Sequence, residues 1–457
     1  MEHANSNTTK QKRTRVSGPF TSTYDKQYDF RIATRNYEKQ FFSMYQHRLN
    51  LLKGRVDLVA IQKWGTGDKK RDGHTIKHRK KILDIASGEL CWVSGTVFCD
   101  LQGKLNILKD VEAGDDDKLP EEKKSYVDGK EEIVMLEDES GRAILHNPEF
   151  LTKNLLVTGC IVAILGVEVQ AGVFEIIDIA YPEPAPQTQR TKQDTENYIA
   201  FVSGLNFDSL ADSMNSELLQ QFLVGELGSD AEQDLASKIS HLVIAGNSIV
   251  SGKPVVDEKN HYGLKNTSTL SLENIEKFDS FIHELLPSIS VTVLPGPKDP
   301  TETLIPQPPL HRSLFKTSKA YLSEKQLVSN PMWLQKGDLR ILGTSGQNLD
   351  DIYKYFNEKP PIMKIMESCI QWQNIAPTAP DTLYCYPNEE TDPFTLSETP
   401  HVFFSGNQTE YGFKLVEIGS GGKTNRVSLI SIPSFSLTGQ LVLLDTSTLT
   451  CRVVTFE

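Results

Sequence analysis

Five apolar segments after residue 197 each run into a turn that contains a glycine. The turns read Ser203-Gly-Leu-Asn206, Ala245-Gly-Asn-Ser248, Pro295-Gly-Pro-Lys-Asp299, Ser345-Gly-Gln-Asn348 and Ser405-Gly-Asn-Gln-Thr409. In open α/β sheets a ligand binds where the strands end at their carboxyl edge, and glycine lets the chain reverse tightly and approach a ligand closely. The series therefore predicts a frame for an active site.

Continuous apolar strands alternate with helical patterns around these turns, which is typical of an α/β sandwich. We expect strands at 198–202, 241–245, 290–294, 339–342, 401–405, 427–432, 440–444 and 452–456. Apolar residues at helical spacing predict helices at 210–222 and 272–285, the second ended by Pro287. This domain is expected to cover residues 198–457.

The side chains that the turns present are almost all neutral. They are Gly204, Asn206, Asn247, Pro297, Lys298, Asn407, Gln408 and Thr409. A two-metal hydrolytic centre must neutralise about four positive charges with carboxylate and imidazole ligands. Only Asp299 is a natural ligand, and Lys298 beside it would repel a cation. We therefore predict no catalytic, cofactor-binding or metal-binding residue and no cofactor.

Other catalytic patterns are missing from the sequence as well. None of the ten histidines falls in a turn; His241 and His401 begin predicted strands, and His283 lies in a predicted helix, so we expect structural roles for them. There is no G-x-x-x-x-G-K-[ST] loop and no G-x-S-x-G elbow. Gly419-Ser-Gly-Gly-Lys423 precedes a predicted strand and therefore predicts a hairpin tip rather than a phosphate loop.

From Glu89 to Ile179 the apolar period changes to two, which indicates strands. We expect them at 91–98, 132–136, 155–165 and 172–179, with an acidic loop over 110–132. Short strands without a long helix favour a small closed barrel of the OB type. Such barrels often bind single-stranded nucleic acid through basic grooves and stacked aromatics, but here Trp92, Phe98 and Phe174 stand among acidic residues. Independent single-strand binding is therefore the weaker hypothesis.

The remaining predicted segments are an N-terminal arm, a helix before the barrel and a linker between the two domains. Phe41, Tyr45, Leu49 and Leu52 recur at helical spacing and predict a helix at 37–55. We predict a disordered arm over 1–34, the helix and barrel over 35–186 and a linker over 187–197. Prolines over 182–186 make the approach to this linker stiff, and the polar residues after them make it flexible.

Charge is unevenly spread along the chain. The net charge is -12, yet residues 1–81 hold 19 Lys and Arg against 7 Asp and Glu. Residues 69–81 concentrate seven of these cations and predict a solvated loop, a nuclear-import signal or a DNA-proximal patch. The six cysteines form no C-x-x-C pair, and neither a secretory signal nor a membrane span is predicted, so we expect a soluble intracellular protein with buried thiols.

The linear order of the turns resembles the calcineurin-like phosphoesterases. That family's metal-binding motifs are Asp-x-His, Gly-Asp-x-x-Asp, Gly-Asn-His-Asp/Glu and Gly-His-x-His. The matching positions are Gly204 and Asn206, Asn247 and Val250, Pro297, Lys298 and Asp299, and Asn407 and Thr409. Only Asp299 matches the family pattern, so the resemblance implies the fold without the activity, and Asp299 is interpreted as a relic or a local turn cap.

Longer motifs resemble one family of accessory subunits. They include Val202-Ser-Gly-Leu-Asn206, Leu136-Glu-Asp-Glu-Ser-Gly-Arg142, Val293-Leu-Pro-Gly-Pro-Lys-Asp-Pro300, Leu342-Gly-Thr-Ser-Gly-Gln-Asn348, Ile375-Ala-Pro-Thr-Ala-Pro-Asp-Thr-Leu383, Cys385-Tyr-Pro387 and Thr391-Asp-Pro-Phe394. With an OB-type domain before most of these motifs, the chain is similar to the small, or B, subunits of eukaryotic DNA polymerase delta. Its sequence resembles those of fungi.

This resemblance implies a non-catalytic scaffold in the nucleus, active in DNA replication and repair. It implies binding to the cysteine-rich C-terminal domain of the catalytic subunit and to the third accessory subunit. It also implies sharing with the translesion polymerase zeta, and DNA contact only within the holoenzyme. The linker is expected to fold back alongside the two domains. An active phosphodiesterase and an independent single-strand-binding protein are the alternatives.

Overall fold

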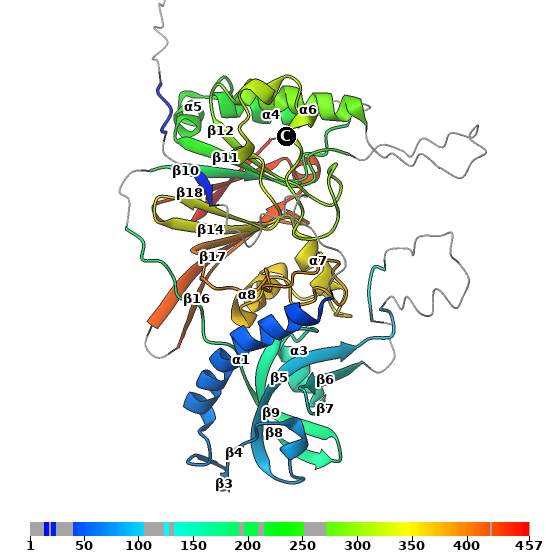
Figure 1. Ribbon diagram of the computed structural model, residues 1–457. Helices are drawn as coiled ribbons and strands as arrows, with labels where there is room; N and C mark the ends of the chain where they lie inside the picture. The colour runs from blue at the N-terminus through cyan, green and yellow to red at the C-terminus, as the bar shows by residue number, and fades with distance from the viewer. Residues whose placement is uncertain are drawn as a thin grey trace, which may run out of the picture.

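Two units stack along the long axis of the molecule, a barrel at one end and a layered sandwich at the other (Figure 1). The computed structural model describes residues 13–17, 20–23, 40–104, 123–127, 132–191, 196–208, 214–250, 271–420 and 423–456. Part of the predicted acidic loop therefore lies outside the described residues.

The barrel is closed by a ring of strand pairings. The chain gives β5 (Leu90–Asp100), β6 (Ile133–Glu137), β7 (Arg142–His146), β8 (Ile161–Gln170) and β9 (Val173–Ala180). Their order is β5-β6-β7-β9-β8, and β8 pairs back with β5. The short helix α3 (Pro148–Lys153) lies between β7 and β8 in the chain. The predicted OB-type barrel is confirmed, although β7 was not predicted and the strand expected at 155–165 begins only at Ile161.

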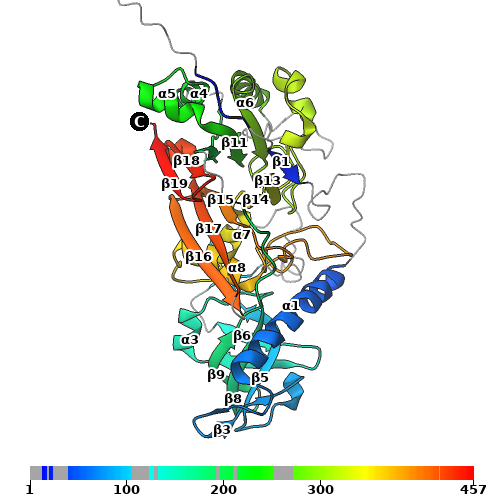
Figure 2. The same ribbon diagram turned by 90° about the vertical axis from the view of Figure 1, so that its left-hand side faces the viewer.

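Helix α1 (Phe42–Trp64) lies across the barrel and reaches the junction with the sandwich (Figures 1 and 2). It begins later and ends later than the predicted helix at 37–55. Every fourth residue from Met44 to Trp64 is buried, because positions four apart lie on one face of a helix. This buried stripe includes one charged residue, Arg48.

The sandwich consists of two mixed sheets packed face to face. One has the order β12-β11-β10-β18-β19, with β10 (Tyr198–Val202), β11 (Ile239–Ala245), β12 (Ser290–Leu294), β18 (Gln440–Asp445) and β19 (Cys451–Thr455). The other has the order β1-β13-β14-β15-β17-β16, with β1 (Thr21–Thr23), β13 (Met332–Lys336), β14 (Leu339–Thr344), β15 (Val402–Gln408), β16 (Gly412–Ser420) and β17 (Lys423–Pro433). All eight predicted strands are present, and β1, β13 and β16 are additional.

Helices cover both outer faces of the sandwich (Figure 1). The five-stranded sheet carries α4 (Met214–Val224), α5 (Asp230–Ser237) and α6 (Leu272–Leu285), whereas α7 (Gln347–Tyr353) and α8 (Ile362–Trp372) lie between the six-stranded sheet and the barrel. Short helical turns are α9 (Phe435–Thr438), η2 (Ile82–Asp84), η3 (Arg312–Leu314), η4 (Ser318–Ala320) and η5 (Glu324–Gln326). The predicted α/β sandwich is thus confirmed.

One hydrophobic core joins the barrel to the sandwich. The same cluster of buried residues contains Met44 of α1, Val93 of β5, Trp372 of α8 and Phe403 of β15. The linker follows the sandwich: the Ala185 amide donates to Gln373 Oε1 at 2.8 Å, and the Gln187 side-chain amide donates to the Arg426 carbonyl at 2.8 Å. Through residue 191 the linker therefore lies against the sandwich rather than hanging free.

Two N-terminal segments differ from the predicted disordered arm. Arg13–Ser17 and Phe20–Thr23 lie on the sandwich, where β1 pairs antiparallel with β13 (Figure 2). Backbone and side-chain contacts with residues far along the sequence hold these segments in place. The composition of residues 1–34 alone does not predict such contacts. The rest of residues 1–34 lies outside the described residues.

Two further expectations can be compared with the structure. Of the six cysteines, which are all free thiols, five are buried and Cys451 is partly buried. Within the part of the chain that the structure describes, no helix is both long and apolar enough to cross a membrane.

Candidate functional site

The five glycine turns meet at one edge of the sandwich, as their spacing predicted. A Cβ built on Gly246 would lie 2.6 Å from Ser345 Cβ, and one on Gly406 would lie 2.3 Å from the Ala245 carbonyl oxygen. A Cβ on Gly296 would lie 2.5 Å from the Asn247 amide nitrogen. These glycines let the loops touch one another, so the volume between the turns is filled by the turns themselves. We call this group of turns the loop cluster.

A neutral amide side chain ties three of the turns together. Asn407 Nδ2 donates to the Ala245 carbonyl at 3.2 Å and to the Ser345 carbonyl at 2.8 Å, while its backbone amide donates to Ser203 Oγ at 2.8 Å. Its φ of 57° lies in the left-handed region, which asparagine tolerates better than most residues. The side-chain amide of Asn407 therefore links the loops through hydrogen bonds to backbone carbonyls.

Asn206 and Asn247 are used in a similar way. Their φ angles are 48° and 52°. Asn206 Nδ2 donates to Ser436 Oγ at 2.7 Å, and Asn247 Oδ1 accepts from the Lys298 backbone amide at 3.1 Å. Both side chains stabilise the turns locally.

Asp299 is buried beneath the loop cluster, with 5% of its surface exposed. Its Oδ1 accepts from the backbone amides of Ser248 at 2.8 Å and Ile249 at 3.1 Å, and its Oδ2 accepts from Gly296 at 2.7 Å. Burial raises the pKa of this carboxyl to about 6, although the backbone donors act in the opposite direction. Both oxygens are thus occupied by the protein in fixing two turns to each other.

The remaining predicted positions add no ligand. Pro297, Lys298 and Thr409 are exposed, and the Val250 amide donates to the Phe207 carbonyl at 3.0 Å. Among the described residues, no group of three His, Cys, Asp or Glu side chains is arranged to hold a metal ion. The geometry of the loop cluster suits a closed structural edge, since one occupied carboxylate cannot neutralise two divalent cations.

The three histidines considered from sequence have structural partners. His241 Nε2 lies 2.8 Å from Thr292 Oγ1, and burial lowers its pKa to about 3. His401 Nδ1 accepts from the Arg340 amide at 3.0 Å. His283 lies in the last turn of α6, 5.8 Å from the ring of Tyr321.

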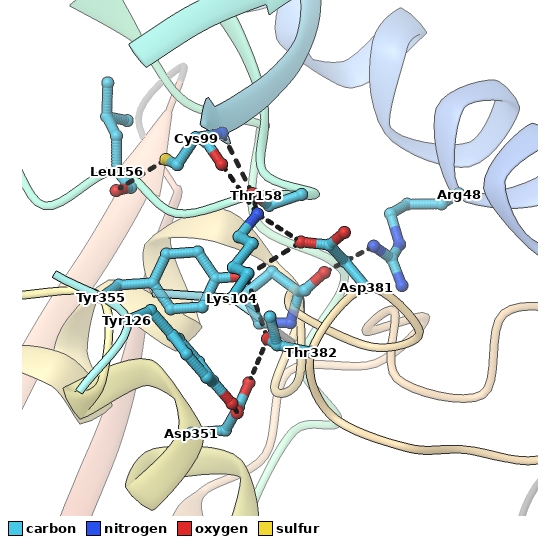
Figure 3. A network of polar contacts seen from close by, with 11 residues as sticks. Arg48, Cys99, Lys104, Tyr126, Leu156, Thr158, Asp351, Tyr355, Asp381 and Thr382 are labelled. Carbon is cyan, nitrogen blue, oxygen red and sulfur yellow. Dashed lines mark hydrogen bonds and ion pairs between the residues drawn. The ribbon is translucent and has the colours of Figure 1, made fainter. Parts of the chain in front are cut away.

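A second buried polar network lies between barrel and sandwich; we call it the interdomain joint (Figure 3). Arg48 of α1 is fully buried and pairs with Asp392 at 2.7 Å. Its other guanidinium nitrogens donate to the carbonyls of Pro377 and Ala379, both at 2.7 Å. Burial alone would lower the pKa of Arg48, but Asp392 outweighs it and the pKa is raised.

Close backbone approach completes this part of the joint. Gly159 has a φ of +90°, and a Cβ on it would lie 2.0 Å from the Pro377 carbonyl oxygen and 2.5 Å from Arg48 Nη1. The loop before β8 can approach the sandwich this closely because residue 159 has no side chain.

A second set of contacts joins the barrel to the same sandwich segment (Figure 3). Lys104 Nζ pairs with Asp381 at 2.6 Å and donates to the Cys99 carbonyl at 2.7 Å. Tyr126 donates its hydroxyl to Asp351 Oδ1 at 2.6 Å, and Thr382 donates to Asp351 Oδ2 at 2.7 Å. The motif over 375–383, quoted above for its resemblance, therefore supplies part of the sandwich side of the joint, together with Asp351 and Asp392.

Sequence reasoning missed the joint, although one signal was present. Arg48 falls in register with the apolar residues Met44, Leu52 and Val56 of α1. A charged residue within an apolar stripe indicates a buried charge, which needs a partner.

The basic segment over 69–81 lies at the far end of the barrel (Figure 1). It forms β2 (Lys70–Arg71), β3 (His74–Thr75) and β4 (Lys77–His78). Lys77 and Arg79 both pair with Glu89, and Lys69 donates to the Gln62 carbonyl near the end of α1. Part of its charge is thus engaged within the barrel.

Two family models match the two units of the fold. Residues 40–179 match the OB-fold domain of DNA polymerase delta subunits. Residues 199–414 match the B-subunit family of DNA polymerases alpha and epsilon. The matched ranges coincide with the barrel and with most of the sandwich.

Curated relatives match the chain over most of its length. The chain is 35% identical to the DNA polymerase delta small subunit of Saccharomyces cerevisiae, over 98% of this chain and 96% of the relative. It is 36% identical to the DNA polymerase delta small subunit of Arabidopsis thaliana, over 82% and 84%. It is 32% identical to the DNA polymerase delta subunit 2 of Drosophila melanogaster, over 94% and 96%.

Proposed function

The chain belongs to the family of small subunits of DNA polymerase delta, and from this premise we propose that it is a non-catalytic scaffold of that polymerase. It would act in the nucleus, in DNA replication and repair. The observation that carries the proposal is the match over nearly the whole length of chain and relative, both domains included.

The loop cluster supports a role without catalysis. Asn407 bonds to backbone carbonyls and Asp299 to backbone amides within the cluster, so neither side chain is free for a metal ion or a substrate. We propose that the chain has no catalytic, metal-binding or cofactor-binding residue. Polymerase chemistry then belongs to its partner.

The interdomain joint supports a role as a bridge. A buried ion pair and a shared core hold barrel and sandwich together, so partners bound to the two units would be held at a defined distance. We propose that these partners are the cysteine-rich C-terminal domain of the catalytic subunit and the third accessory subunit. We also propose that the chain is shared with the catalytic subunit of polymerase zeta and that it contacts DNA only within the holoenzyme.

Co-expression tests the bridge directly. The chain is produced with the catalytic subunit's C-terminal domain and the third subunit, then purified through a tag on the third subunit alone. We expect one stoichiometric complex at moderate salt, with the C-terminal domain retained through this chain. Loss of the C-terminal domain under these conditions, from a correctly folded chain, would contradict the proposal.

Two assays separate the scaffold from its alternatives. Elemental analysis and a phosphodiester hydrolysis assay on the pure chain should find neither bound divalent metal nor turnover; two metals per chain with turnover would establish a phosphodiesterase. Single-stranded DNA binding at low salt should be negligible. Tight binding by the isolated chain, lost when the basic residues of Lys77–Lys81 are neutralised, would instead establish a single-strand-binding protein.

A further inference from the structure

The N-terminal arm is attached to the domain that is last in the chain. Residues 13–17 run along α4 and α5, and β1 lies on β13, although α1 and the barrel follow directly in sequence (Figures 1 and 2). These contacts have three separate parts: an arginine site, a ring platform and a strand edge.

The arginine site is built from the ends of two helices. The Arg15 guanidinium donates to the carbonyls of Ala236 at 2.9 Å and Ile239 at 2.8 Å, and also to the carbonyl of Leu223. Leu223 and Ala236 lie in the last turns of α4 and α5. Carbonyls at helix C-termini carry partial negative charge and favour a cation, and the planar donors of arginine can reach three of them at once.

The ring platform lies on the neighbouring strand. Phe20 stacks on His241 with ring centroids 3.6 Å apart and an interplanar angle of 17°. Because burial lowers the pKa of His241 to about 3, its ring is neutral at physiological pH and offers an uncharged face to an aromatic side chain.

The strand edge belongs to β13. Thr21 pairs with Gln335, Ser22 with Leu334 and Thr23 with Trp333. Without β1, β13 would be the outermost strand of its sheet. An unpaired apolar edge can add a strand from another molecule.

We propose that these three parts form a peptide-binding site for an extended segment with an arginine followed five residues later by an aromatic residue. In the free protein the chain's own residues 13–17 and 20–23 occupy it, and β1 pairs antiparallel with β13. The arm thereby closes the β13 edge and ties the N-terminus to the sandwich, independently of α1. The site recognises its ligand by side chains at two points and by backbone pairing at a third.

Cleavage of the folded chain tests this site without a truncated variant. A specific protease sequence is placed within residues 24–39 of the full chain, and the purified protein is cut. We expect the released arm to co-elute with the body in size-exclusion chromatography. A synthetic peptide covering residues 11–24 should then exchange with it, whereas the uncut chain should bind that peptide at least tenfold more weakly.

Matched substitutions identify which side chains of the arm the site recognises. Arg15→Met and Phe20→Ala in the cut chain should each speed arm dissociation at least tenfold, and hydrogen exchange of the Met332–Lys336 amides should rise in parallel. Arg13→Ala is the control, because its ion pair with Asp230 is on the surface, and it should change dissociation less than twofold. Immediate loss of the unaltered arm after cleavage would overturn the proposal, as would equal dissociation of the Arg15→Met and Arg13→Ala arms.

Discussion

Asp299 and Asp392 are both almost fully buried, yet the two regions that hold them differ in kind. Asp299 in the loop cluster is held by backbone amides, and its pKa is raised to about 6. Asp392 in the interdomain joint faces the guanidinium of Arg48. In the loop cluster, backbone amides stabilise the carboxylate, whereas the joint provides a full cation beside it.

This difference explains how the two regions contribute to the fold. In the loop cluster, neutral amides connect turns within one domain through hydrogen bonds to the backbone. In the joint, full opposite charges connect two domains, and removing only one partner of a buried ion pair is strongly destabilising. We therefore expect loss of charge to be most harmful in the joint.

The largest expected effect tests the joint. Arg48→Ala leaves Asp392 buried without its cation and removes the guanidinium donors of the Pro377 and Ala379 carbonyls, so the free energy of unfolding should fall by about 3–5 kcal/mol. Urea denaturation at neutral pH measures this change. Lys63→Ala is the control, since its pair with Asp178 is partly exposed and should contribute less than about 1 kcal/mol. Equal losses would contradict the expectation that the buried pair of the joint contributes more than a partly exposed pair.

Burial of Asp299 in the loop cluster should make stability depend on pH in the opposite direction to that expected for an ion-paired aspartate. Because the folded pKa of Asp299 lies above its unfolded value, its contribution to stability is greatest below about pH 4 and is lost as pH rises through about 6. A shift of this size corresponds to on the order of 3 kcal/mol. The difference in unfolding free energy between the native chain and Asp299→Asn should follow this curve, and a pH-independent difference would contradict the prediction.

Close backbone contact at the joint predicts a smaller effect. Gly159→Ala would push a Cβ to 2.0 Å from a carbonyl oxygen, so it should cost about 1–3 kcal/mol beyond backbone strain. Gly172→Ala is matched in conformation, because its φ is +79° but nothing lies within 4 Å of the added Cβ. Thermal unfolding of both variants separates strain from collision. Equal melting temperatures would indicate that the joint can open to accept the methyl group.

The smallest expected effect concerns the second set of contacts at the joint. Tyr126→Phe removes the hydroxyl that donates to Asp351 and should lower the unfolding free energy by about 1–2 kcal/mol. Tyr384→Phe provides the control, since Tyr384 is 56% exposed. If both substitutions are neutral in urea denaturation, the Tyr126 contact adds nothing to the joint.

Much of the fold could be predicted from local patterns. Apolar runs located the eight sandwich strands, and alternation located β5, β6 and β9, because these patterns follow from burial on two faces or on one. β16 escaped prediction because it is an edge strand whose Leu415 and Glu417 are exposed. α8 escaped because its face against the barrel is defined only once the two domains meet.

The candidate site was predictable in part. The turns and their convergence follow from the residues that end each strand. The contacts of Asp299 and Asn407 do not, since their partners are backbone groups of other turns. The sequence does not indicate which backbone amide will face a given side chain.

The sequence by itself determined the two fold types and the glycine frame, because both depend on residue identity at regular spacing, and its longer motifs carried the resemblance to the family. Only the tertiary structure decided that Arg48 joins two domains, that residues 375–383 receive it, and that the arm returns to β13. The physical reason is distance along the chain: hundreds of residues separate Arg48 from Asp392, and β1 from β13. Such contacts exist only after packing has brought the segments together.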